Sequence, residues 1–112
     1  MATVQTSLWH FTIEFDERKA AAHGTTVDEL YDRVGAFVEP YGNVRVGRGT
    51  WQARDARSGF RAQCPAVCDL SKQRWVIQNV RSWVTFEGDG DPQGEDYLAV
   101  IRRVRPRLLC AE

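Results

Sequence analysis

Apolar and polar residues alternate near the N-terminus of the chain. Over residues 8–15, every second position from Trp9 to Phe15 is aromatic or branched, and His10 belongs to the other set. Period-two alternation places one set of side chains on the core face of a strand and the other set on the opposite face. We therefore predict a strand over 8–15, with His10 as a structural rather than a catalytic residue.

The next pattern has the period of a helix. Thr26 and Glu29 match the capping box, in which the Thr oxygen accepts a hydrogen bond from the third amide and the Glu reaches back. Pro40 and Gly42 end the pattern. Between these signals an apolar stripe predicts a core-facing helix over 26–39: Val27, Leu30, Tyr31, Val34, Phe37 and Val38.

Two further strands are predicted in the middle of the chain. The first covers residues 43–55 and is interrupted by Gly47 and Gly49, and glycine inside a strand indicates a bulge or a close backbone approach. The second covers residues 60–68, where apolar and polar positions alternate again. Because proline cannot donate to a strand ladder, this strand ends at Pro65 or lies at an edge.

Residues 74–88, RWVIQNVRSWVTFEG, form the most apolar stretch and predict a central strand. Aromatic and β-branched residues suit a pleated surface, and both faces of this stretch are mostly apolar. The same residues also fit one face of a helix. In that alternative, Ser71 caps a helix that runs to about Arg81, and a short strand follows over 82–86.

The acidic segment over residues 87–96 is predicted to be a loop, with Asp91-Pro92 as a candidate helix start. Apolar positions at helical spacing then predict a helix over 97–104. Acids before this segment and arginines at its end match the helix dipole. Alternation over 97–101 leaves a hairpin strand as the alternative.

These elements predict a single α+β domain over residues 1–112. About four antiparallel strands pack against the 26–39 helix in the order β-α-β-β-β-α, and the alternative for 71–81 gives β-α-β-β-α-β, the ferredoxin-like order. A chain of 112 residues is long enough to bury a core without disulfides. We expect residues 1–6 and 107–112 to fray.

Composition predicts a cytoplasmic protein without cofactor or metal. No apolar run approaches the length of a membrane span, and the first residues do not resemble a signal peptide. The three cysteines, Cys64, Cys68 and Cys110, are an odd number at a spacing that is poor for zinc, so we interpret them as reduced thiols. The two histidines lie in no catalytic motif, which favours a protein that is not an enzyme.

The formal net charge is zero, but the charges are segregated along the chain. Residues 43–83 carry eight bases and two acids, whereas residues 84–97 carry five acids and no base. If the basic segment folds as neighbouring strands, its arginines form one positive patch on the sheet, with tryptophans as anchors. The candidate partner-binding residues are Arg45, Arg48, Trp51, Arg54, Arg57, Arg61, Arg74 and Trp75, with an acidic loop of Glu87, Asp89 and Asp91.

The function predicted from this charge pattern is binding of another protein. An inhibitor, an immunity protein or a phage anti-defence (anti-CRISPR-like) factor fits the size and the segregated charge. One alternative is a nucleic-acid-binding protein with an arginine-rich sheet face. A second alternative is a small-ligand or enzymatic domain that places His10 and the cysteines in a pocket. A homodimer through a free sheet edge also stays open. In the competing interpretation, the arginines pair with the chain's own acids and the tryptophans are core.

Overall fold

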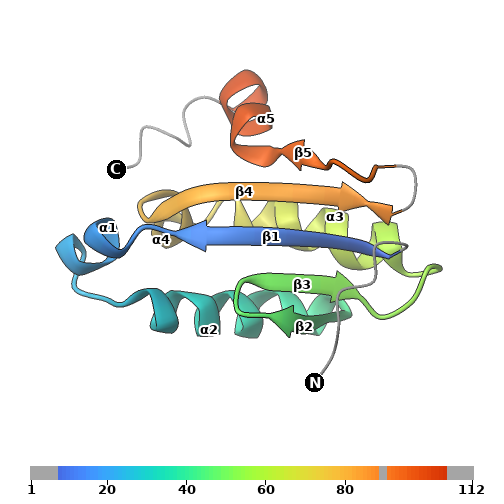
Figure 1. Ribbon diagram of the computed structural model, residues 1–112, viewed down its shortest axis with the longest axis horizontal. Coiled ribbons are helices and arrows are strands. Elements are labelled where there is room, and N and C mark those ends of the chain that lie inside the picture. The colour runs from blue at the N-terminus through green and yellow to red at the C-terminus, as the bar shows by residue number, and fades with distance from the viewer. Residues whose placement is uncertain (1–7, 89–90, 106–112) are drawn as a thin grey trace.

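The strand predicted at the N-terminus lies at the centre of a five-stranded antiparallel sheet. The computed structural model describes residues 8–88 and 91–105. Its strands are ordered β2-β3-β1-β4-β5 across the sheet (Figure 1). Their bounds are β1 Trp9–Phe15, β2 Asn43–Gly47, β3 Thr50–Ala53, β4 Val80–Glu87 and β5 Glu95–Asp96.

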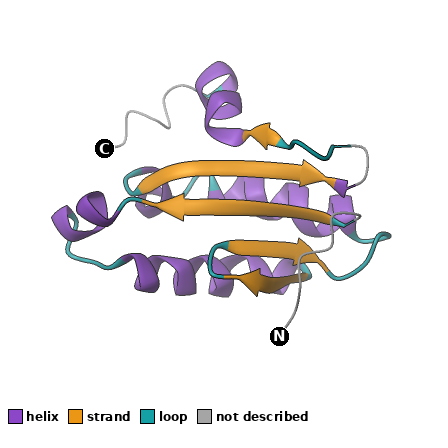
Figure 2. Cartoon of the chain, viewed as in Figure 1, coloured by secondary structure: helices purple, strands orange, loops and turns teal. Residues whose placement is uncertain are grey.

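Two long helices, α2 (Val27–Val38) and α3 (Gly59–Leu70), lie behind the sheet in Figure 1. The chain therefore has the predicted α+β class, but two helices rather than one cover the sheet. Its long elements follow the alternative order β-α-β-β-α-β, with β5 added at one edge. Three short helices connect the long elements: α1 Glu17–Ala22, the 3-10 turn Glu39–Tyr41 and α4 Arg74–Ile77. Helix α5, Tyr97–Val104, follows β5 (Figure 2).

The predictions for β1 and α2 are confirmed. Phe11 and Ile13 are almost completely buried on the core face of β1. The Thr26 hydroxyl oxygen accepts a hydrogen bond from the Glu29 amide at 3.2 Å, as the capping box requires. Gly42 adopts φ +106°, a left-handed conformation that favours glycine, and the chain turns there into β2.

The single strand predicted over 43–55 is wrong, because the segment folds back on itself as the hairpin of β2 and β3. The interrupting glycines lie in and beside its turn. The Gly49 carbonyl accepts a hydrogen bond from the Ile13 amide at 2.8 Å, and a Cβ atom on Gly49 would lie 2.3 Å from the Ile13 carbonyl oxygen. The close backbone approach predicted from the glycines is therefore confirmed at Gly49, which contacts the Ile13 backbone from the turn between β2 and β3 and not from within a strand.

The strand predicted over 60–68 is also wrong, because these residues belong to α3. Alternation over a few residues does not exclude a helix, and the buried set recurs at helical spacing: Ala62, Gln63, Ala66, Val67 and Leu70. Pro65 lies inside this helix and is exposed. Phe60 lies on the outside of the first turn, where it is 68% exposed.

Neither prediction for residues 74–88 is fully correct. The first residues form the short helix α4, as in the alternative, but this helix ends at Ile77, and β4 begins at Val80. Asn79 joins the two elements. Its side-chain amide donates to the Trp75 carbonyl at 2.7 Å, and its backbone carbonyl accepts from the Asp16 amide at 2.8 Å. The strand is covered on one face only, since Trp83 is fully buried whereas Val84 and Phe86 on the other face are partly exposed.

The helix predicted over 97–104 is confirmed as α5, but it begins elsewhere than at Asp91. The Asp96 carboxylate caps it, accepting hydrogen bonds from the Leu98 and Ala99 amides at 3.1 and 3.2 Å. The predicted frayed ends, 1–6 and 107–112, lie outside the described residues. Among the described residues, no helix is long and apolar enough to cross a bilayer.

Candidate functional site

The arginines predicted to form one patch lie in three separate places. On the β2–β3 hairpin, Arg45 forms an ion pair with Asp32 at 3.2 Å, and Arg48 forms one with Asp28 at 2.6 Å. Both acids belong to α2. The positive charge of the hairpin is therefore compensated within the chain, which agrees with the competing interpretation of these two arginines.

The two candidate tryptophans also lie apart. Trp51 is fully buried, and its indole N–H donates to the Glu39 carboxylate at 3.1 Å, so this residue belongs to the core and not to a surface. Trp75 is partly buried beneath the Arg33 guanidinium, which lies 4.2 Å from the ring centre. Arg74, exposed beside it, lies past the end of α3, a helix of 12 residues and therefore about 18 Å long.

The third group is an exposed surface at the start of α3. We call it the α3-start surface and define it by Arg54, Arg57, Phe60 and Arg61, all of which are exposed. The Phe60 ring meets the Trp9 ring edge-on, with 6.0 Å between the ring centres. Within the described part of the chain, none of these three arginines forms a salt bridge. This surface therefore combines an exposed aromatic ring with three arginines that form no salt bridge among the described residues, although the Asp55 charge interacts with that of Arg57.

The loop that carries this surface is held in shape by Asp55. Its carboxylate accepts a hydrogen bond from the Ser58 amide at 2.9 Å, and the Ser58 hydroxyl donates to the Asp55 carbonyl at 3.2 Å. The hydrogen bond from the Ser58 amide is the main reason that the pKa of Asp55 is lowered. These hydrogen bonds close the turn from Asp55 to Ser58.

The open face of the sheet does not carry the predicted arginines. It presents Thr12 and Glu14 of β1, which are exposed, and His10, which points to the same face but is buried against the Phe86 ring. Arg61 lies on α3 instead of a strand, and Arg45 pairs with α2 behind the sheet. The prediction of an arginine-rich sheet face is therefore wrong in its geometry, because residues 60–68, which were predicted as a strand of that sheet, form part of α3.

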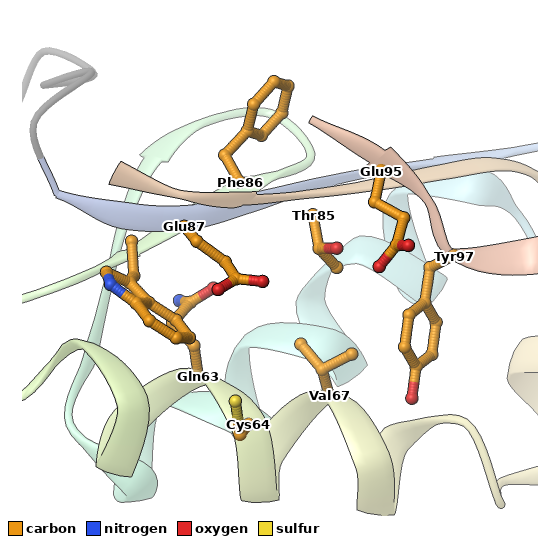
Figure 3. A pocket seen from close by; sticks show the side chains of 9 residues that line it. Gln63, Cys64, Val67, Thr85, Phe86, Glu87, Glu95 and Tyr97 are labelled. Atoms are coloured by element: carbon orange, nitrogen blue, oxygen red, sulfur yellow. The ribbon is translucent and has the colours of Figure 1, made fainter. Parts of the chain in front are cut away.

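A cavity of about 240 Å³ lies beside this surface, between α3 and the sheet (Figure 3). In Figure 3, Cys64 and Val67 rise from α3, Thr85 faces them from β4, and Tyr97 closes one end. Trp9, which contacts Phe60, also lines the cavity.

Two carboxylates, those of Glu87 and Glu95, point into this space in Figure 3. Strand register explains their position, since Glu95 is paired with Thr85, and Glu87 follows Thr85 by two residues on the same face of β4. Glu87 belonged to the predicted acidic loop. Of the other two acids, Asp91 accepts a hydrogen bond from the Gly94 amide at 3.1 Å, and Asp89 lies outside the described residues.

The cavity does not contain an activated nucleophile. Burial raises the pKa of the Cys64 thiol, and the negative charge of Glu87 raises it further. His10 lies on the other face of the sheet, where its ring stacks on Phe86 with 4.3 Å between centres. The Cys–His pair considered from the sequence is therefore not formed by Cys64 and His10.

Sequence reasoning missed Trp9, Glu95 and Tyr97 as cavity residues. Trp9 was assigned only to the core face of a strand and Tyr97 only to the apolar positions of a helix, and β5 is a strand of two residues that has no periodicity to detect. Comparison of the chain with protein-family models and with curated proteins gives no match.

Proposed function

We propose that this chain is a small protein-binding domain that holds an acidic partner protein through the α3-start surface. The observation that carries the proposal is Phe60, a large aromatic residue that is 68% exposed on a well-packed helix. Phenylalanine is enriched at protein interfaces, and arginine is among the residue types that dominate their binding energy.

The charges around Phe60 favour an acidic partner. Arg54, Arg57 and Arg61 are exposed, and a guanidinium forms bidentate hydrogen bonds with a carboxylate. The hydrogen bonds of the Asp55 turn favour tight binding, because a loop closed by its own bonds loses less conformational entropy when the partner docks. Arg45, Arg48, Arg74 and Trp75 lie elsewhere, and their contact with a partner stays a prediction.

Binding without catalysis is the form of activity that we propose. His10 is stacked on Phe86, and His23 shares a hydrogen bond with the Asn79 side chain at 2.9 Å, so each imidazole has a structural contact. Inhibition of an enzyme, immunity to a toxin and anti-defence activity all consist of such binding, and they are the finer part of the proposal. Zero net charge favours a protein partner over nucleic acid.

The test is capture of partners by the tagged full-length chain from a lysate of its source, with and without nuclease. A captured protein is then titrated against a Phe60→Ala, Arg61→Glu variant. The matched control is Val104→Ala, Arg102→Glu, which changes an apolar residue of similar exposure and an exposed arginine on α5. We expect the first variant to weaken binding by at least about tenfold, because interface hot spots contribute about 2 kcal/mol or more.

Three results would contradict the proposal. Binding that is equally weakened in both variants would show that the α3-start surface has no special role. Binding unchanged by Phe60→Ala, Arg61→Glu would place the interface elsewhere. Recovery of nucleic acid instead of protein, with an affinity that falls steeply as salt is added, would favour the nucleic-acid alternative.

A further inference from the structure

We infer that the cavity between α3 and β4 is a binding site for a small organic cation with a short apolar stem, such as a primary alkylamine. This inference concerns the cavity itself and does not rest on the protein-binding proposal. It follows from the walls of the cavity, the placement of its two carboxylates and its size.

The walls are suited to an apolar stem. Val67 and Cys64 project from α3, and Tyr97 closes one end (Figure 3). The polar amide nitrogen of Gln63 is already used inside the core, where it donates to the Asn43 carboxamide oxygen at 2.7 Å and to the Trp51 carbonyl at 3.3 Å. A hydrocarbon chain in this space would therefore lose contact with water without displacing a protein hydrogen bond.

The carboxylates supply the complementary charge. Glu87 and Glu95 are exposed residues whose carboxylates point into the cavity from β4 and β5, so they stand at its solvent side. Within the described residues neither forms a salt bridge. Two unpaired carboxylates above an apolar floor attract a cation and repel an anion.

Aromatic rings add a second attraction for a cation. A tryptophan face attracts an ammonium group within about 6 Å, and Trp9 lines the cavity. Gly59 at the start of α3 leaves room for this ring, since a Cβ atom there would lie 2.6 Å from Cδ1 of Trp9. The position of Trp9 is therefore set by the helix on which Phe60 also lies.

The chemistry favours an organic cation over a metal ion. Among the described residues, no three side chains of His, Cys, Asp or Glu are placed to hold a metal. The volume of about 240 Å³ accommodates on the order of eight water-sized groups, since water occupies about 30 Å³ in the liquid. An amine with about four to six carbons fits this space.

The experiment is an NMR titration of the full chain with n-butylammonium at constant ionic strength, with n-butanol and butyrate as neutral and anionic analogues. We expect saturable shifts of the Val67 methyl groups and the Thr85 amide with butylammonium, and none of the Val34 methyl groups in the core. Butanol should bind at least about tenfold more weakly, and butyrate should not bind, because the interaction of the ammonium group with the carboxylates is lost or reversed.

The protein variants are Glu87→Gln with Glu95→Gln, and Glu17→Gln as the control on an exposed glutamate of α1. The double variant should weaken butylammonium binding by at least about tenfold, and the control by less than about twofold. Equal affinity for butylammonium and butanol, unchanged affinity in the double variant, or no saturable shift would overturn the inference.

One further arm identifies the source of the amine. The probe is Nα-acetyl-lysine N-methylamide, a lysine side chain on a blocked backbone. Binding at least as tight as that of butylammonium supports the site and assigns the amine to a lysine of a protein. Exclusion of the blocked lysine, with butylammonium still bound, supports the site and assigns it to a free small amine.

Discussion

At the scale of single residues, Asn43 joins more of the fold than any pattern in the sequence indicated. Its side-chain amide donates to the Val38 carbonyl at 2.9 Å and to the Ala62 carbonyl at 2.8 Å, and its oxygen accepts from Gln63 at 2.7 Å. It is 2% exposed. One polar side chain thus connects the end of α2, the first strand of the hairpin and α3.

Replacing Asn43 by alanine should therefore lower the free energy of unfolding by about 2–4 kcal/mol, because the buried Val38 and Ala62 carbonyls would each lose a hydrogen bond and the Gln63 amide would keep only its bond to Trp51. Thr12→Ala is the control, since the Thr12 hydroxyl bonds Thr50 on the exposed face. Urea unfolding measures both variants. Similar losses in the two would show that burial of the Asn43 bonds has no special effect.

The hairpin turn supplies a second residue-scale prediction. Gly49→Ala should destabilise the protein by about 1–3 kcal/mol, because the added methyl group would overlap the Ile13 carbonyl and force the backbone apart. At Gly47 in the same hairpin the nearest atoms would lie 3.5 Å away, an ordinary contact. The thermal midpoint of Gly47→Ala should remain much closer to that of the wild type, and a larger drop for Gly47→Ala than for Gly49→Ala would refute this account.

At the scale of elements, α3 forms despite an internal proline. Pro65 has no amide hydrogen to donate to the Arg61 carbonyl, so one bond of the helix is absent. Pro65→Ala should restore it and raise the free energy of unfolding by about 1–3 kcal/mol. Pro40 is the matched control, because it lies in the first turn of a 3-10 helix, where proline is tolerated. Pro40→Ala should give little or no gain, and an equal gain in both variants would contradict the explanation.

The cap of α1 predicts part of the acid sensitivity. The Asp16 carboxylate accepts hydrogen bonds from the Lys19 and Arg18 amides, and the bond from Lys19 is the main reason that its pKa is lowered. A carboxyl with a lower pKa in the folded state stabilises that state above its unfolded pKa, near 3.8, and loses this effect as the pH falls. The stability difference between the wild type and Asp16→Asn should therefore shrink below about pH 4.

Chemical unfolding between pH 6 and pH 2 measures that difference. Glu17→Gln, the neighbouring substitution, serves as the control. A difference between the wild type and Asp16→Asn that stays constant over this range would show that the cap does not depend on the charge of Asp16.

At the scale of the whole molecule, the sheet order determines which hydrogen bonds are protected. β1 is paired on both sides, with β3 and β4, and its inward residues are core. β5 is a short edge strand paired on one side only. Among the amides of the five strands, hydrogen exchange corrected for intrinsic rates should therefore be slowest for Phe11 and Ile13 and fastest in β5. The reason is that edge strands open more readily than central strands. Protection in β5 equal to that of β1 would contradict this order.

The elements that the sequence predicted correctly depend on local chemistry. The Thr26 cap and the apolar stripe define α2, alternation defines β1, and an acidic start with a basic end defines α5. Errors occurred where short-range patterns were ambiguous. Over 60–68, alternation and a proline favoured a strand, whereas burial against the sheet stabilised a helix.

In the candidate site, too, local sequence predicted some features, whereas others depend on the folded chain. Arg54, Arg57, Arg61 and Glu87 were predicted as binding residues, whereas Phe60 was not, because it was assigned to the apolar set of a predicted strand. The grouping of these residues was not predictable, because it depends on pairings between residues far apart in the chain. The contact of Trp9 with Phe60 and the pairing of Glu95 with Thr85 exist only in the folded sheet.

Local chemistry is therefore enough to establish an α+β domain, its first strand, its first long helix and the segregation of its charge. Neighbours along the chain interact over a few residues, so caps, periodicity and turn residues carry that information. Only the folded chain separates the paired arginines of the hairpin from the unpaired ones at α3, and only it turns Glu87 and Glu95 toward a common cavity. The physical reason is that burial and ion pairing are properties of distances between elements, and packing of the whole core sets those distances.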